Sequence, residues 1–466
     1  MDKIYEVVRY VLATDYEDLP QRVVEKTKEC FIDTIGVILA GSSALGCCEV
    51  VEQVNYWGGR EESTILVYGG KVPSLFAAFT NSMMAHARDF DDDHEEGSVH
   101  PSASVIPTGI AIAEQIGGVD GKKFITAIAI GIDLVCRLGL SLRVLQGWHL
   151  SGICGGIGSV ATAGKLLGLG KDQLWNAFGI AYSQTTGNSQ GRRDGAMTKR
   201  MNPGFASKAA VLSAYLAKRG ITGPKNVMEG KEGFFNMFDG GDYFDPEKLR
   251  SKMDGTSYSH NELTKDLGKV FKVEEISFKP YPCCRFLHAP IDATLKNVQR
   301  NNIQPEDVEE VTVRACKRAM NNYSQPFEIR DTAQIDAQFN IPYGVAAAIL
   351  RRQVGLKDFE DAAVRDPLVL EITKKIRVVV NPKAHLKVPV VVEIKTRNGK
   401  TYTSYVEEII GGPKQPMTRD EFLGKFYDCA RYAARPISSK KLEDFLFLAN
   451  HLETLDDIRK AINLLV

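Results

Sequence analysis

The sequence lacks the features that distinguish secreted, membrane-spanning and nucleic-acid-binding proteins. Its nine cysteines, an odd number in a chain of 466 residues, show no CxxC spacing typical of a zinc ribbon or a redox dithiol. The 58 basic residues match the 58 acidic residues, so no net charge attracts the chain to nucleic acid or to an anionic membrane. We expect reduced thiols, no nucleic-acid or membrane partner, and a cytoplasmic location.

Long apolar runs are also missing. The first part of the chain, residues 1–20, carries acids throughout and lacks the uninterrupted apolar core of a signal peptide. The most apolar later run, 124–140, contains Asp133 and Arg137 and is shorter than the roughly 20 apolar residues that span a bilayer. We expect this run to form a helix buried in the core.

Residues 1–265 have the pattern of a large helical bundle. After Pro20, the apolar residues Val24, Phe31 and Ile35 are spaced for one helix face. Further helices are predicted at 73–87, 103–117, 121–140, 151–168, 171–187, 204–219 and 223–236, where glycine or proline separates the runs. Small residues are dense in 152–168 and 179–187, which predicts closely packed helices at the centre of the bundle.

The pattern changes near residue 265. Alternating β-branched runs predict strands at 308–314, 376–380, 389–396 and 402–407, the last two joined by a turn at 397–400. Helical signals return at 418–435, 438–450 and 454–465. Because single cores seldom exceed roughly 250–300 residues, a chain of this length is expected to divide into domains. The changes of pattern place the boundaries near residues 265 and 410.

The densest polar cluster lies between two predicted helices. Residues 86–100 hold six carboxylates and three imidazoles, among them Asp89, Asp93 and His100. Crowded acids and histidines perturb one another's pKa values, so such a loop can supply a base and an acid near neutral pH. The alternative is a solvated acidic loop that caps the next helix.

A second patch carries cations suited to an anionic ligand. Residues 190–204 place Arg192, Arg193, Lys199 and Arg200 in a glycine-bounded loop, a pattern that favours binding of a carboxylate or phosphate. The loop lacks the GxxxxGK[ST] order of a P-loop, which argues against nucleotide binding.

A third patch and a separate histidine complete the candidates. Residues 278–288 carry Lys279, Arg285 and two adjacent thiols in a segment that prolines make rigid, as suits a preorganised site. A cysteine pair beside aromatic residues is typical of packing, so no thiol nucleophile is predicted. His149 precedes a glycine-rich helix start, where free N–H groups favour anions, although a lone histidine is usually structural.

Four blocks together resemble the MmgE/PrpD family. In order, they read HARDFDDDHEEGSVHPSASVIP, GWHLSGICGGIGSVATAGKLLGL, DGAMTKRMNPGFASKAAVLSAYLAKRGITGP and FKPYPCCRFLHAPIDA, and the likeness covers roughly residues 5–430. That family includes 2-methylcitrate dehydratase, cis-aconitate decarboxylase and iminodisuccinate epimerase. The resemblance implies a mainly α fold, a homodimer and an active site between two domains. These are a large all-helical domain built from both chain ends, 1–265 and 410–466, and a smaller α/β lid domain, 266–409.

The resemblance also implies a set of site residues. Carried over residue by residue, the family's site falls on Asp89, His100, His149, Lys199, Lys279 and Tyr343. We add Asp93 to the catalytic candidates, and we add Arg200 and Arg285 to the two lysines as substrate-binding candidates. The expected substrate is a small di- or tricarboxylate. The lysines would stabilise negative charge on its carboxylates while an imidazole moves a proton, so neither a cofactor nor a metal is expected.

Three positions depart from the pattern of the family's decarboxylases. Asp93 stands where many relatives carry threonine, and Asn202 and Cys284 stand where family decarboxylases can carry histidines. These differences favour a hydro-lyase similar to 2-methylcitrate dehydratase. Decarboxylation and epimerisation build the same pattern of charge, so both stay open as alternatives.

Two further alternatives come from other classes of protein. Residues 91–95 approximate the aspartate-rich magnesium–diphosphate motif of helical isoprenoid synthases, although no second acidic cluster accompanies them. A non-catalytic helical scaffold is the other, and it leaves the three polar patches unexplained. EDTA would stop the synthase and spare the acid–base enzyme, whereas a scaffold would turn over no polycarboxylate.

Overall fold

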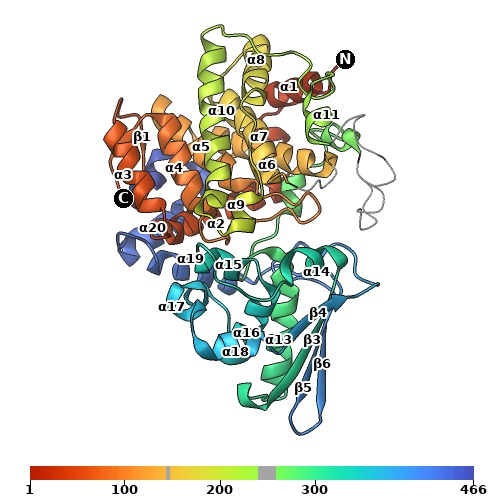
Figure 1. Ribbon diagram of the computed structural model, residues 1–466. Coiled ribbons are helices and arrows are strands. Elements are labelled where there is room, and N and C mark those ends of the chain that lie inside the picture. Colours follow the sequence, from red (N-terminus) through yellow and green to blue (C-terminus); the bar gives the residue numbers. More distant parts are fainter. Residues whose placement is uncertain (143–146, 240–258) are drawn as a thin grey trace.

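Figure 1 shows a computed structural model of the chain, which describes residues 1–142, 147–239 and 259–466. A larger helical body lies above a smaller body that contains a four-stranded sheet. The elements of the larger body are α1 Ile4–Ala13, α2 Gln21–Gly41, α3 Cys47–Trp57, β1 Ser63–Thr64, β2 Lys71–Val72, α4 Ser74–His86, α5 Ser102–Ile116, α6 Gly121–Ser141, α7 Leu150–Leu167, α8 Lys171–Tyr182, α9 Gln190–Asp194, α10 Asn202–Lys218, α11 Phe234–Phe238, α19 Arg419–Arg431, α20 Ser439–Asn450 and α21 Arg459–Ile462. The predicted mainly α fold is confirmed.

One continuous apolar core in the larger body joins the two ends of the chain. It combines buried residues between Ile4 and Phe278, taken from the described parts of the chain, with Leu356 and with residues between Phe422 and Leu465. On α19, the Phe426 ring stacks on Phe445 of α20 with 5.8 Å between centroids, and Phe445 lies 5.7 Å from Phe31 of α2. The C-terminal helices therefore complete the bundle that the N-terminal helices begin.

Glycines at the centre of the bundle let α6 and α7 pack closely. A Cβ at Gly158 of α7 would lie 2.3 Å from Val135 Cγ2 and 2.5 Å from the backbone oxygen of Gly131 on α6. Both helices are long and apolar enough to cross a membrane, but 94% of the α6 window and 89% of the α7 window are buried inside the protein. The expectation of a buried core helix at 124–140 is confirmed.

The smaller body has its own apolar core, formed by residues 283–409. Its elements are α13 His288–Arg300, β3 Val308–Ala315, α14 Lys317–Tyr323, α15 Ala333–Gln338, α16 Ile341–Arg351, α17 Asp361–Val364, α18 Pro367–Thr373, β4 Ile376–Val380, β5 Val390–Thr396 and β6 Thr401–Val406. The strand order is β4-β3-β5-β6, with β3 and β4 parallel and the other pairs antiparallel. Gly399, with a φ of 82°, supports the left-handed backbone in the predicted β5–β6 turn.

Two segments differ from the sequence-based expectation. Residues 223–236 form turns before the short helix α11, because Gly223 packs against α8, where a Cβ would lie 2.6 Å from the Asn176 carbonyl oxygen. Residues 454–465 hold only one α-helical turn, α21. There the Ile458 amide donates to the Val119 carbonyl at 2.9 Å, so the backbone is bonded to a neighbouring loop instead of to its own preceding turn.

We predict that Gly158→Ala destabilises the fold. The new methyl group overlaps Val135 and the α6 backbone, and such overpacking typically costs about 1–3 kcal/mol. Gly156→Ala is the matched control on the same helix, because a Cβ there has no neighbour closer than 3.8 Å. Urea unfolding followed by circular dichroism measures both variants. Wild-type stability in Gly158→Ala would contradict the close packing of α6 and α7.

Candidate active site

The predicted acidic cluster lies in the loop between α4 and α5, which distant parts of the chain hold in place. Lys425 of α19 donates to the Phe90 carbonyl at 2.8 Å. Two backbone hydrogen bonds of 2.9 Å pair Asp93 with Ser277, in the segment that leads to the smaller body. Asp89 has left-handed backbone, with a φ of 52°. The loop is therefore fixed by tertiary contacts at several points.

Asp89 lies between two buried lysines. Its carboxylate is ion-paired with Lys199, in the 3-10 turn before α10, and with Lys279 Nζ at 3.2 Å. Lys279 also donates to the Asp89 carbonyl at 2.8 Å. Burial raises the pKa of Asp89, but the two lysine charges together hold it well below its usual range. Burial opposes charge on Lys279, yet Asp89 raises the pKa of that lysine. The charged forms of Asp89 and Lys279 therefore stabilise each other.

Three imidazoles lie close together beside these charges, with His86 next to the other two. The His86 ring centroid is 5.1 Å from that of His100 and 5.4 Å from that of His149. His100 Nδ1 is 2.7 Å from the Asp92 carbonyl, so Nδ1 donates and Nε2 is left as the proton acceptor. His86 Nδ1 is hydrogen-bonded to the Asp91 carboxyl group at 2.6 Å. Within the described residues, His86 Nε2 and His149 Nδ1 have no hydrogen-bond partner.

Burial keeps these imidazoles neutral. It lowers the pKa of His100 to about 4, with Lys279 acting in the same direction. It lowers the pKa of His86 and of His149 well below the usual range, and Lys199 adds to that effect. Neutral imidazoles can accept protons at physiological pH.

Asp93 pairs with a lysine that the sequence does not single out. Lys387 Nζ, from the smaller body, lies 3.1 Å from Asp93 Oδ2 and donates to the Glu95 carbonyl at 3.1 Å. Asp93 Oδ1 is 3.8 Å from His100 Nδ1. Burial raises the pKa of Asp93, but the charge of Lys387 brings it well below its usual range. Asp93 is therefore ionised next to His100.

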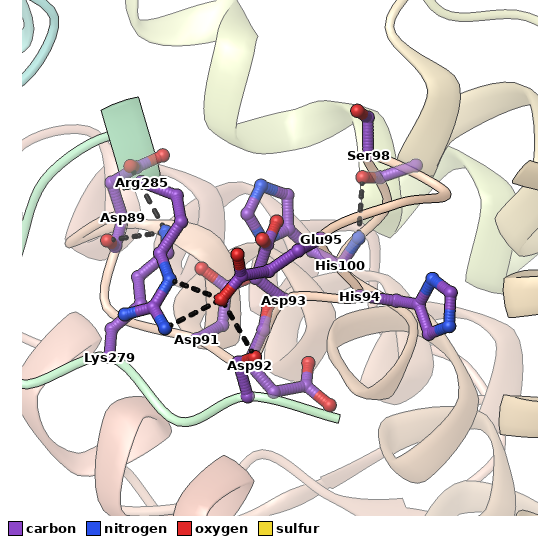
Figure 2. A network of polar contacts seen from close by, with 12 residues as sticks. Asp89, Asp91, Asp92, Asp93, His94, Glu95, Ser98, His100, Lys279 and Arg285 are labelled. Carbon is purple, nitrogen blue, oxygen red and sulfur yellow. Dashed lines mark hydrogen bonds and ion pairs between the residues drawn. The ribbon is translucent and has the colours of Figure 1, made fainter. Parts of the chain in front are cut away.

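Other members of the cluster support the loop (Figure 2). Arg285 donates from Nη2 to the Glu95 carboxylate at 2.7 Å and from Nη1 to the Ile410 carbonyl at 2.9 Å. The charge of this predicted substrate-binding residue is thus already paired. The His94 ring points away from the cluster, and its Nε2 lies 3.1 Å from Glu275.

Two predicted residues have other partners. Tyr343 is fully buried in the core of the smaller body, where its hydroxyl donates to the Asp358 carbonyl. The structure does not bring Tyr343 into the cluster, because its ring and hydroxyl are both occupied in that core. Arg200 donates to the Leu45 carbonyl at 3.0 Å and to the Gln334 side chain at 3.3 Å, so its donors are also engaged by the protein.

Sequence reasoning missed three members of the cluster. His86 and Asp91 lie inside the acidic patch, and the pairing of an imidazole with a carboxylate five residues later was the available signal. Lys387 carried no signal, because it lies 294 residues from its partner Asp93, in a loop between two strands.

The consecutive aspartates do not converge on one point. Asp91 faces His86, Asp92 accepts a 2.5 Å hydrogen bond from Ser102, and Asp93 faces Lys387. In the ranges that the structure describes, no group of three or more His, Cys, Asp or Glu side chains could hold a metal ion. This divergence argues against the aspartate-rich magnesium motif, and metal independence stays a prediction.

A buried set of neutral imidazoles, carboxylates and ammonium groups, contributed by two bodies, has the components that acid–base catalysis requires. Models of the MmgE/PrpD N-terminal domain and the MmgE/PrpD C-terminal domain match residues 6–247 and 281–445. The chain belongs to the MmgE/PrpD family, as its sequence blocks indicate.

Similar proteins of known activity are lyases. The chain is 27% identical over 475 residues to cis-aconitate decarboxylase of Aspergillus terreus, covering 97% of this chain and 93% of that protein. It is 24% identical over 459 residues to cis-aconitate decarboxylase of Homo sapiens, covering 94% and 89%. It is 22% identical over 407 residues to 2-methylcitrate dehydratase of Salmonella typhi, covering 80% and 76%. The chain is an enzyme of this lyase class.

We predict that folding stability falls as the pH drops from about 6.5 towards 4. The folded state keeps His100 neutral, with a pKa of about 4, whereas the unfolded chain takes up a proton below its ordinary pKa of about 6.5. The stability that neutral His100 contributes is therefore complete above the pKa of this histidine in the unfolded chain, and it is lost as the pH falls towards the folded-state pKa. Urea unfolding at a series of pH values should show that the free energy of unfolding depends less steeply on pH in His100→Asn than in the wild type. The exposed His451→Asn is the control, and an unchanged slope in His100→Asn would contradict the buried neutral state.

Proposed function

We propose that this enzyme is a hydro-lyase of the 2-methylcitrate dehydratase type, which removes water from a tricarboxylate by acid–base chemistry. The observation that supports it is the placing of neutral imidazoles beside two charged, buried lysines. An imidazole can take a proton from a carbon next to a carboxylate. The lysines can stabilise the negative charge that this step builds on the carboxylate oxygens.

His100 is the proposed base. Its Nδ1–H is fixed by the Asp92 carbonyl at 2.7 Å, which orients the ring and leaves Nε2 free to accept a proton. The carboxylates of Asp91 and Asp93 lie 3.9 Å and 3.8 Å from Nδ1, and both stabilise the imidazolium that forms. His149 is the proposed second proton carrier, because its Nδ1 is buried and unpartnered within the described residues.

Lys199 and Lys279 are the proposed charge-stabilising groups. Asp89 sets their positions and is not a nucleophile, since both of its oxygens are occupied by ammonium groups. In the proposed reaction the base takes the proton, the electrons of the C–H bond form a carbon–carbon double bond, and the C–O bond at the neighbouring carbon breaks. The departing hydroxide takes a proton from an imidazolium and leaves as water.

Decarboxylation is the second candidate. The similarity to cis-aconitate decarboxylases extends over 97% of this chain, against 80% for the dehydratase of Salmonella typhi. The ionised Asp93 and its partner Lys387 argue for dehydration, because they place a full ion pair where many relatives have a neutral hydroxyl. Epimerisation would use the same base but would expel neither hydroxide nor carbon dioxide.

A substrate screen tests the proposal. Purified enzyme is incubated with 2-methylcitrate, citrate and cis-aconitate in deuterated water, and products are followed by NMR. Dehydration yields an unsaturated tricarboxylate, whereas decarboxylation yields carbon dioxide and a dicarboxylate. Carbon dioxide release from cis-aconitate without dehydration of any hydroxy acid would contradict the hydro-lyase proposal and support a decarboxylase.

We predict that Lys279→Ala and Lys199→Ala each lower kcat about 10²–10³-fold, because each removes a fixed charge at a developing oxyanion. The control is Lys414→Ala, which removes a surface lysine paired with Glu408. Steady-state kinetics with the best substrate measures the effect. Near-normal kcat in either site variant would remove that lysine from the proposed mechanism.

A further inference from the structure

Most of the positive charge at the centre of the site is compensated by carboxylates of the protein. Lys199 and Lys279 share Asp89, Lys387 pairs with Asp93 and Arg285 pairs with Glu95, so four cations face three carboxylates and one positive charge is in excess. A substrate with two or three carboxylates brings additional negative charge into this buried region. Its binding therefore calls for positive charge that is not yet neutralised.

Two partly buried arginines supply such charge. Arg192 lies on α9 of the larger body, Arg318 lies on α14 of the smaller body, and neither forms an ion pair within the part of the chain that the structure describes. Arg192 lies over the Tyr323 ring at 5.2 Å, and Arg318 lies over the Phe286 ring at 5.2 Å. Those two rings are stacked on each other, with 5.1 Å between centroids. Each body thus places one guanidinium against the same aromatic pair.

Both arginines border the proposed active site. Arg192 lies over the Phe339 ring at 5.8 Å, and Lys199 Nζ lies over the same ring at 4.8 Å, so Arg192 and Lys199 contact one aromatic side chain. Arg318 Nη1 lies 3.5 Å from Ser98 Oγ, on the loop that carries the acidic cluster. Arg192 therefore lies near a lysine of the site, and Arg318 lies beside the loop that carries the acidic cluster.

Building on the proposed function, we propose that Arg192 and Arg318 form a carboxylate-binding subsite for the substrate carboxylate most distant from the reacting carbon. A guanidinium binds a carboxylate through paired N–H donors and stays charged at all physiological pH values. The aromatic rings beneath restrict its movement and favour the cation. Because one arginine comes from each body, the bound carboxylate also links the two bodies.

Calorimetric titration with tricarballylate tests the subsite without turnover, since this saturated tricarboxylate has no hydroxyl to lose. We expect Arg192→Gln and Arg318→Gln each to weaken binding about ten- to a hundredfold, as loss of a charged hydrogen-bonding partner does. Arg192→Lys should recover part of the loss, which a packing role would not predict. Arg193→Gln and Lys317→Gln, exposed neighbours on the same two helices, should keep wild-type affinity.

Steady-state kinetics separates this role from chemistry. With the substrate found in the screen, both glutamine variants should raise KM while kcat stays within about twofold, the pattern of lost ground-state binding. Wild-type affinity for tricarballylate in both variants would overturn the subsite, as would failure of the wild-type protein to bind tricarballylate. Binding that depends on these arginines, without turnover of any polycarboxylate, would keep the subsite and contradict the proposed function.

Discussion

The charge on Asp89 is the constraint on which the rest of the site depends. Two buried ammonium groups, Lys199 and Lys279, lie against this one carboxylate, and burying them without it would be strongly unfavourable. The pairing fixes both the position and the charge of the groups that the proposed mechanism places at the substrate. The lysines in turn add to the burial that keeps His86 and His149 neutral, so the cluster is one coupled electrostatic unit.

The two bodies build this unit together. The loop between α4 and α5 supplies the carboxylates and His100, whereas Lys387 and Arg285 reach the same loop from the smaller body. Helix α19, near the C-terminus, fixes the loop through the hydrogen bond from Lys425 to the Phe90 carbonyl. A site assembled in this way depends on how the two bodies are placed, because charged groups of one body pair with those of the other.

The sequence predicted the regular parts of the fold well, because periodic burial produces a periodic pattern. The helix after Pro20 and the hairpin around Gly399 are examples. It failed at 223–236, where glycine contacts with α8 override helical signals. For the site, sequence proximity and family resemblance predicted Asp89, His100, Lys199 and Lys279 as site residues. The structure brings these four side chains together, and their roles stay predictions. Lys387 had no local signal, and only the structure shows that Tyr343 is enclosed in the other core.

The most direct test of this account is a double-mutant cycle on the free energy of unfolding in urea, using Asp89→Asn, Lys279→Met and the double variant. Asp89→Asn leaves two buried ammonium groups uncompensated and should cost about 3–5 kcal/mol, whereas Lys279→Met leaves Asp89 paired with Lys199. The account predicts that Lys279→Met recovers part of the stability lost in Asp89→Asn, so that the two effects are strongly non-additive. Additive losses would contradict a site held together by the charge of Asp89.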